Sequence, residues 1–126
     1  MEAIKEDYIS FDVAKLLKEK GFNEDCRDSY DWGGNFHLNT SSNNGSIKKI
    51  AAPTLQMVMK WLREVHNICI TIYPDKAKRY EAVLYDPKDN VEIILQSFGI
   101  SGSHIFGDSY EEACEAAIKY CLENLI

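Results

Sequence analysis

The sequence predicts an α+β fold: a helix and an irregular arm, then a helix, a three-stranded antiparallel sheet and a closing helix in two layers. Segments near residues 10–22, 53–67 and 109–125 place apolar residues at helical spacing between helix start and stop signals. Three strand-like runs follow one another between residues 68 and 98. With 126 residues, 45% of them hydrophobic and 27% charged, the chain suits one core, so we expect a single domain over residues 1–126.

The first helix is recognised by its ends. Ser10 is placed to cap the first free amides, and Asp12 suits the positive end of the helix dipole. Gly21 supplies a left-handed stop, after which Phe22 is expected to fold back on Leu17. These signals predict a short surface helix between Ser10 and Gly21.

The arm, residues 24–50, has a weaker pattern. Its Gly33-Gly34 pair predicts a hairpin turn between the runs CRDSYDW and NFHLNT. Residues 39–46 are Asn, Thr, Ser and Gly only, and long segments of this kind are often functional or disordered. We therefore expect a mobile loop over residues 39–50.

Aromatic residues are concentrated in the arm, where Tyr30, Trp32 and Phe36 lie within seven residues and next to His37. Two roles are open for them: they plug the edge of the core, or they form a binding surface. We favour the plug because exposed aromatic clusters are costly. If these side chains are exposed, the arm is the first candidate site.

The second helix and the sheet follow the arm. Pro53 is expected at the first helical position, since its missing donor would be unpaired there anyway. The apolar stripe of this helix is Leu55, Val58, Met59, Leu62 and Val65, with Trp61 on the flank.

Three strand-like runs follow the second helix: ICITIYP, RYEAVLYD and VEIILQSF. They are joined by the turn-forming segments PDKAK and PKDN, which favours an antiparallel meander. In the second run, alternation places Tyr80, Ala82 and Leu84 on one face and Glu81, Val83 and Tyr85 on the other.

The closing helix follows a glycine-rich connection, FGISGSHIFG. Ser109 and Glu112 form a capping box at its start. Glu115 and Lys119 are expected to pair on its outward face. Its predicted buried face consists of Ala113, Cys114, Ala117, Tyr120, Cys121 and Leu125.

The formal charge of −6 is unevenly distributed: −4 over residues 1–46, +5 over residues 47–79 and −7 over residues 80–126. Only the middle segment carries enough cations to grip a phosphate backbone. We interpret its cations as a solvated surface, or as a contact for an acidic partner or the acidic half of a second copy, in preference to a nucleic-acid groove. This basic set is Lys48, Lys49, Lys60, Arg63, Lys76, Lys78 and Arg79.

Other protein classes are disfavoured by what the sequence does not contain. No apolar run approaches the length of a membrane span, and the start MEAIKEDYIS is unlike a signal peptide, so we expect a cytoplasmic protein with no membrane partner. The spacings HxH, HExxH and CxxC are missing from the sequence. We therefore predict that the protein binds no metal and no cofactor, and that it is not an enzyme. The four cysteines are expected to be buried free thiols.

The three histidines are the remaining candidates for chemistry. His66 ends a helix, where a cation suits the dipole. His104 lies in the loop SGSHIFG, where a bound anion is the alternative to a plain loop. His37 belongs to the aromatic arm, so His37 and His104 join Tyr30, Trp32 and Phe36 as candidate binding residues.

The helix–three strands–helix order is similar to that of the double-stranded RNA-binding domain, whose last helix begins with phosphate-gripping lysines. Here that helix begins with Asp108, Glu111 and Glu112, so RNA binding is not implied.

The run RYEAVLYDPKDNVEIILQSFG and the closing helix resemble HicB-type antitoxins, although the Pro-x-x-Pro-Gly-Cys stretch of those proteins is absent. Their Gly-Asp-Thr-x-x-Glu-Ala pattern is matched by Gly107, Asp108, Ser109, Glu112 and Ala113.

Three segments of the chain resemble uncharacterised small proteins of gut anaerobes and of their phages or prophages. They are ISFDVAKLLKEKGF, PTLQMVMKWLREVHNICITI and SYEEACEAAIKYCLENLI. This resemblance spans most of the chain except residues 39–50 and implies a short phage or mobile-element accessory protein, with no functional residues to transfer. We therefore predict a non-enzymatic protein that acts through contact with an unknown protein partner. Homodimerisation through an open sheet edge or through the arm fits the same interpretation.

Two alternatives from other classes stay open. One is a nucleic-acid-associated, antitoxin-like regulator, whose binding would weaken steeply as salt rises. The other is a small-molecule site near Trp32 and residues 99–107, which requires a concave apolar pocket.

Overall fold

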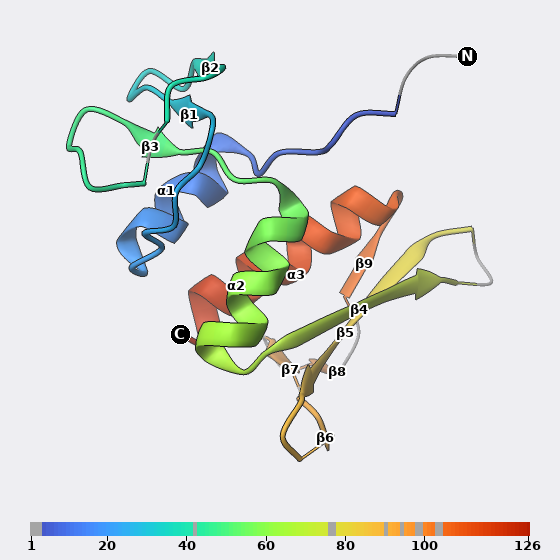
Figure 1. Cartoon of the computed structure of the whole chain (residues 1–126). Coiled ribbons are helices and arrows are strands. Elements are labelled where there is room, and N and C mark those ends of the chain that lie inside the picture. The colour runs from blue at the N-terminus through green and yellow to red at the C-terminus, as the bar shows by residue number, and fades with distance from the viewer. Residues whose placement is uncertain are drawn as a thin grey trace.

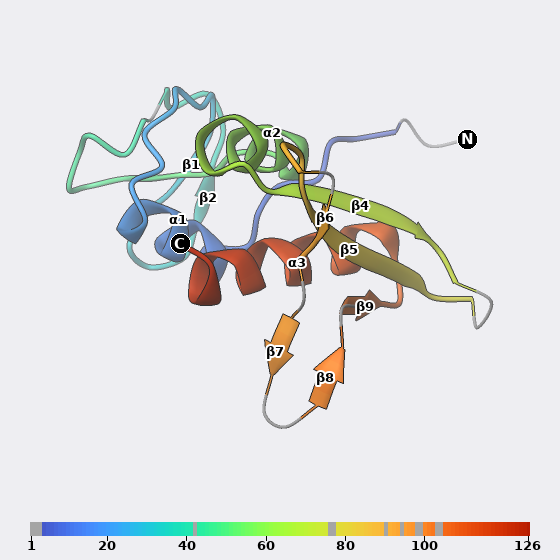
Figure 2. The same ribbon diagram turned by 90° about the horizontal axis from the view of Figure 1, so that it is seen from below.

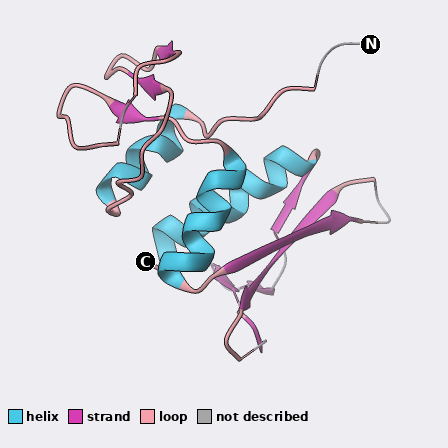
Figure 3. Ribbon diagram, in the orientation of Figure 1, coloured by secondary structure: helices cyan, strands magenta, loops and turns pink. Residues whose placement is uncertain are grey.

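The computed structural model describes residues 4–41, 43–75, 78–89, 91–93, 95–97, 100–102 and 105–126, and it has the α+β fold that the sequence predicts (Figure 1). Its helices are α1 (Phe11–Glu19), α2 (Leu55–His66) and α3 (Tyr110–Asn124). The strands form a main sheet beside α2 and α3, a small sheet in the arm and a separate hairpin. Figure 3 shows the arm strands set apart from the main sheet, on the other side of the helices.

The helices begin where side-chain oxygens cap their first amides. The hydroxyl of Ser10 accepts from the N–H of Val13, and that of Ser109 accepts from the N–H of Glu112. Gly21, with φ +88°, ends α1 as predicted, because glycine has no Cβ and adopts this left-handed backbone at little cost. These local predictions are confirmed.

The predicted position of Pro53 is wrong by two residues. The cap of α2 is Thr54, whose hydroxyl accepts from the N–H of Met57, and the helix starts at Leu55. Pro53 precedes the cap, and its carbonyl accepts a hydrogen bond from the N–H of Ile9 at 3.0 Å. A proline before the cap therefore helps to fix the N-terminal segment against the start of α2.

The main sheet is built on β4 (Cys69–Pro74) and β5 (Tyr80–Asp86), which pair antiparallel along their whole length. The other side of β5 pairs with β6 (Val91–Glu92) near one end and with β9 (Ile105–Gly107) near the other. Two further strands, β7 (Leu95–Ser97) and β8 (Ile100–Gly102), pair with each other and form a separate two-stranded sheet in the described structure. Figure 2 shows their hairpin projecting away from the sheet.

The third predicted strand is thus interrupted. If β6 continued along β5 from the pair Asp86–Val91, Leu95 would lie opposite Ala82. The residue opposite Ala82 is Ile105, ten positions later. The segment FGISGSHIFG, expected to be only a connection, includes β8, which pairs with β7, and β9, which pairs with β5. Glycine and serine residues do not prevent strand pairing where a partner strand is available.

One face of the main sheet is covered by α3, and we call it the inner face. Ala82 and Leu84 are buried there, while Thr71 and Tyr73 of β4 lie on the opposite, outer face and are exposed. The burial of β5 does not alternate fully, because Val83 on the outer face is also buried. Gly107 allows the close approach of α3, since a Cβ at this position would lie 2.4 Å from the nitrogen of Ala113. A side chain at position 107 is therefore excluded by the backbone of the first helical turn.

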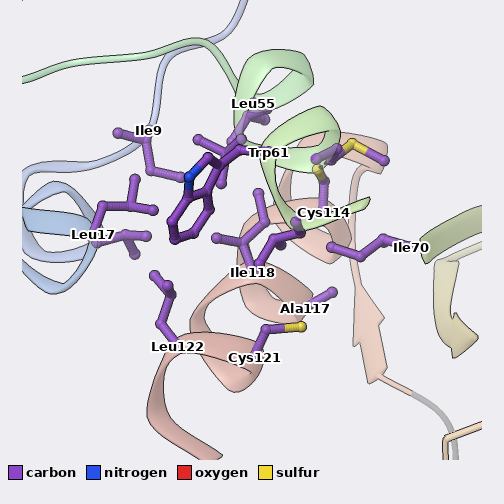
Figure 4. Packing of buried hydrophobic residues seen from close by; sticks show 14 of the residues in the cluster. Ile9, Leu17, Leu55, Trp61, Ile70, Cys114, Ala117, Ile118, Cys121 and Leu122 are labelled. Carbon is purple, nitrogen blue, oxygen red and sulfur yellow. Dashed lines mark hydrogen bonds between the residues drawn. The ribbon is translucent and has the colours of Figure 1, made fainter. Parts of the chain in front are cut away.

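The core lies between the three helices and the inner face (Figure 4). Trp61 belongs to it and packs edge-on against Phe22, with ring centroids 5.2 Å apart, whereas Val65 is exposed. On α3, Ile118 and Leu122 are buried where Tyr120 and Leu125 were expected. The reason is that α3 contacts α1 and α2 as well as the sheet, so its apolar face is wider than one stripe.

The four cysteines are free thiols, as predicted. Burial raises the pKa of Cys26 to about 11 and the pKa values of Cys114 and Cys121 to about 12. Cys69, on the outer face of β4, is only half-buried. The three buried thiols stay protonated at neutral pH and act as small apolar side chains.

Glu115 joins the closing helix to the first helix. Its carboxylate accepts a hydrogen bond of 2.6 Å from the backbone N–H of Ser10, the residue that caps α1. The expected outward ion pair with Lys119 is not formed. An anion beside the first residues of α1 is also favourable for its dipole, so Glu115 stabilises a helix far away in the sequence.

Candidate functional site

The arm forms a small antiparallel sheet of strands β1 (Ser29–Tyr30), β2 (Phe36–His37) and β3 (Ile50–Ala51), in the order β2-β1-β3. The hairpin predicted around Gly33 and Gly34 is confirmed, and Gly34 has a positive φ of 85°. Sequence analysis missed β3, which pairs with β1. A strand of two residues carries no detectable alternation.

Tyr30 plugs the edge of the core, the role that we favoured. Its ring lies 5.5 Å from that of Phe11 and 5.5 Å from that of Phe36, and its hydroxyl donates to the carbonyl of Ile9 at 2.7 Å. Phe36 also packs edge-on against Tyr8, with centroids 5.0 Å apart. Tyr30 therefore attaches the arm to the start of α1, while Phe36 stays partly exposed on the outside of this aromatic row.

Trp32 takes the opposite role, because 56% of the residue is exposed. Its indole N–H donates to the carbonyl of Ile47 at 2.6 Å, so that Ile47, which is 84% exposed, lies beside it. The ammonium of Lys18 lies 5.7 Å from the Trp32 ring and donates to the carbonyls of Ser46 and Lys49. The exposed pair of Trp32 and Ile47 is thus held in place by α1.

Leu38 follows β2 and is 62% exposed. Together the exposed apolar side chains of the arm are defined as the arm surface: Trp32, Phe36, Leu38 and Ile47.

Three lysines accompany Trp32 and Ile47. Lys18 approaches the indole, Lys48 directly follows Ile47, and Lys49 donates to the carbonyl of Thr40. Within the described part of the chain, no carboxylate lies at ion-pair distance from any of these three ammonium groups. The arm surface therefore combines exposed apolar groups with uncompensated positive charge.

His37 is part of a turn that Asp31 organises. Its Nε2 lies 3.0 Å from one carboxylate oxygen of Asp31, and the other oxygen accepts from the N–H groups of Gly33 and Asn35. The contact with His37, followed by the N–H of Asn35, holds the pKa of Asp31 well below its usual range. Across the hairpin, Ser29 is buried and its hydroxyl is shared with Thr40 at 2.6 Å, so it is not presented as a nucleophile.

Asp28 lies at the base of the arm and was not singled out from the sequence. Only 2% of it is exposed, and its carboxylate accepts from the N–H of Asn39 at 2.9 Å. Burial alone would raise its pKa, but the Asn39 N–H, the Tyr8 hydroxyl and the Arg27 guanidinium together lower it. Asp28 is therefore charged and fixes the end of β2 to the N-terminal segment.

The basic set is divided among three places. Lys48 and Lys49 precede β3, Lys60 and Arg63 are on α2, and Lys78 and Arg79 are in the turn between β4 and β5. Figure 1 shows the loop before β3 and the β4–β5 turn on opposite sides of the molecule. Arg79 is bound to Asp75 at 3.0 Å and stacks on Phe106. Lys76 and His104 lie outside the described residues.

Two surface hollows lie away from Trp32. One of about 250 Å³ lies between the N-terminal segment and the start of α2, next to Arg27 and Cys26, and one of about 210 Å³ lies beside Trp61 and Val65. Trp32 lines neither of them. Among the described residues, no group of three or more His, Cys, Asp or Glu side chains has the arrangement of a metal site. In the same residues, no helix is both long and apolar enough to cross a membrane.

No protein-family model, no curated protein and no solved structure matches this chain.

Proposed function

We propose that this is a cytoplasmic accessory protein of a phage or mobile element, and that it acts by binding another protein through the arm surface. One observation carries the proposal: Trp32, Leu38 and Ile47 are each more than half exposed, within a single short segment of the chain. At protein interfaces a few residues supply most of the binding energy, and they are often aromatic side chains surrounded by contacts that contribute little. The arm supplies such a group on a support fixed by Tyr30 and Asp28.

The charge of the arm indicates the chemistry of the partner. Lys18, Lys48 and Lys49 have no carboxylate partner in the described structure, although the chain as a whole is acidic. A protein surface with acidic groups around an apolar pocket is complementary to this arrangement. Nucleic-acid binding is the second candidate, but the described members of the basic set are separated into three places and form no continuous groove.

The test compares two double variants of the tagged protein in affinity capture from host lysate. Leu38→Ser with Ile47→Ser removes two exposed aliphatic groups from the arm surface. Val65→Ser with Val91→Ser removes two aliphatic groups outside the arm that are also more than half exposed, at 54% and 58%. We expect a stoichiometric, nuclease-resistant protein partner that the arm variant loses and the control variant keeps. Equal capture by both variants would contradict the proposal, and capture that disappears with nuclease would favour the nucleic-acid candidate.

A further inference from the structure

The two edges of the main sheet are built differently. On one side of β5 the edge is divided between β6, with two residues, and β9, with three, and a projecting hairpin separates them. On the other side β4 runs for six residues, CITIYP, without a charged residue. Figure 2 shows β4 and β9 on opposite sides of β5. Short strands and interruptions are the usual protection of a sheet edge, and within the described part of the main sheet the edge at β4 has neither.

The hydrogen-bond pattern identifies the main-chain groups that this edge presents. The N–H of Ile93 donates to the carbonyl of Leu84, so Leu84 directs its main-chain groups away from β4. In an antiparallel sheet these directions alternate, and Val83, which pairs with Thr71, therefore directs its groups towards β4. It follows that Thr71 bonds inward, while Ile70 and Ile72 direct their N–H and C=O groups to the open edge.

We propose that the edge of β4 pairs with the same strand of a second copy of this chain, antiparallel and with Thr71 on the two-fold axis. In this register Ile70 of one copy lies opposite Ile72 of the other, which gives four main-chain hydrogen bonds. Every edge-directed group of both isoleucines is then paired. A register shifted by two residues would place Ile70 opposite Pro74, which has no N–H to donate.

The side chains and the charges on both strands are compatible with this pairing of two copies. Ile72 is only partly buried in one copy and would be covered by Ile70 of the other, while the exposed Thr71 side chains meet each other on the outer face. No two like charges lie opposite within the paired strands. At each end, Asp75 of one copy lies beside Asn67 of the other, directly after the helical turn that carries Arg63 and His66. This pairing is isologous, as in most homodimers.

The interface formed by one strand pair is small, so the dimer should be reversible and dependent on concentration. Sedimentation equilibrium from micromolar to millimolar protein is expected to show a species of twice the monomer mass of 14.4 kDa. Thr71→Lys places two ammonium groups against each other at the axis and should weaken dimerisation by about tenfold or more. Asn23→Lys adds the same charge at an exposed position outside the sheet and serves as the matched control.

A cross-linking experiment tests the register. Opposite residues of a non-hydrogen-bonded antiparallel pair have Cα atoms about 4.5 Å apart, within the range of a disulfide. Thr71→Cys should therefore form an intermolecular disulfide under mild oxidation, whereas the wild-type protein and Asn23→Cys should not. A protein that stays monomeric up to millimolar concentration overturns the proposal. A dimer that Thr71→Lys leaves intact, or that Thr71→Cys does not cross-link, overturns it as well. The Leu38→Ser, Ile47→Ser variant should still dimerise, so this result does not depend on the function of the arm.

Discussion

The arm and the helix–sheet body are stabilised in different ways. The body buries apolar side chains on long elements, and Leu62, Leu84 and Ile118 have no exposed surface. The arm has strands of two residues each and depends on polar side chains that bind its backbone. Besides Asp28, Asp31 and Lys18, Asn44 donates to the carbonyl of Phe22 at 2.9 Å and accepts from the N–H of Ala51 at 2.7 Å.

Because of this difference, the stability of the fold and the positioning of the arm surface depend on different interactions. Apolar burial tolerates some change of shape, because it is proportional to area and has no direction. Hydrogen bonds fix a backbone in one geometry but each contributes only about 0.5–1.5 kcal/mol net. The body should therefore determine whether the chain folds, and the polar contacts of the arm should determine whether Trp32 and Ile47 keep their positions.

The largest effect is expected from a cavity in the body. Leu62→Ala removes a fully buried side chain of α2 from the core and should lower the free energy of unfolding by about 2–5 kcal/mol. Leu38→Ala, on the arm surface, is the control and should change it by less than about 0.5 kcal/mol. Urea unfolding followed by circular dichroism measures both. Similar losses for the two variants would mean that arm and body are one energetic unit.

An intermediate effect is expected from the buried carboxylate of the arm. Asp28→Asn keeps the size of the side chain but weakens its bonds with Asn39, Tyr8 and Arg27, which should cost about 1–3 kcal/mol. If the arm loosens before the body unfolds, amide hydrogen exchange should accelerate in β1 and β2 and stay slow in β5. Uniform acceleration in all three strands would contradict a separate role for the polar contacts.

The smallest effect is expected from acid. The folded pKa of Asp31 is lowered, so its contribution is present at pH values above the ordinary carboxyl range, about pH 4, and is lost as the pH falls through the folded pKa. Trp32 is the next residue, and its fluorescence should report the loosening of the turn at low pH. Asp31→Asn should remove this acid-dependent change while leaving the buried Trp61 unaffected. An identical acid response in that variant would show that another group is responsible.

Local signals were sufficient for most of the body. The caps at Ser10 and Ser109, the stop at Gly21 and the alternation of faces along β5 each depend on residues a few positions apart, and all are confirmed. The sequence also singled out Trp32 and Tyr30, but it did not separate the exposed ring from the plugging one. That distinction depends on Phe11 and Ile47, which are distant in sequence.

Contacts over long sequence distance account for what was missed. The ammonium of Lys18 holds the loop before β3 from 28 and 31 residues away, and Glu115 binds Ser10 over 105 residues. In the sequence Lys18 is one of several outward lysines and Glu115 one of several outward acids, so nothing local marks them. The interruption of the third strand was missed for a similar reason, because only the pairing of Ile105 with Ala82 shows that the strand resumes.

The length of that interruption has a consequence for how the sequence can vary. Side chains alternate between the two faces with a period of two residues, and the offset of ten between β6 and β9 is even. Ile93 and Ile105 therefore both face α3, as they would in a continuous strand. Because the hairpin of β7 and β8 lies outside the pairing with β5, insertions or deletions within it need not shift the register of β9, and Ile105 can stay opposite Ala82. The projecting hairpin is thus a site where variants of different length can share one core.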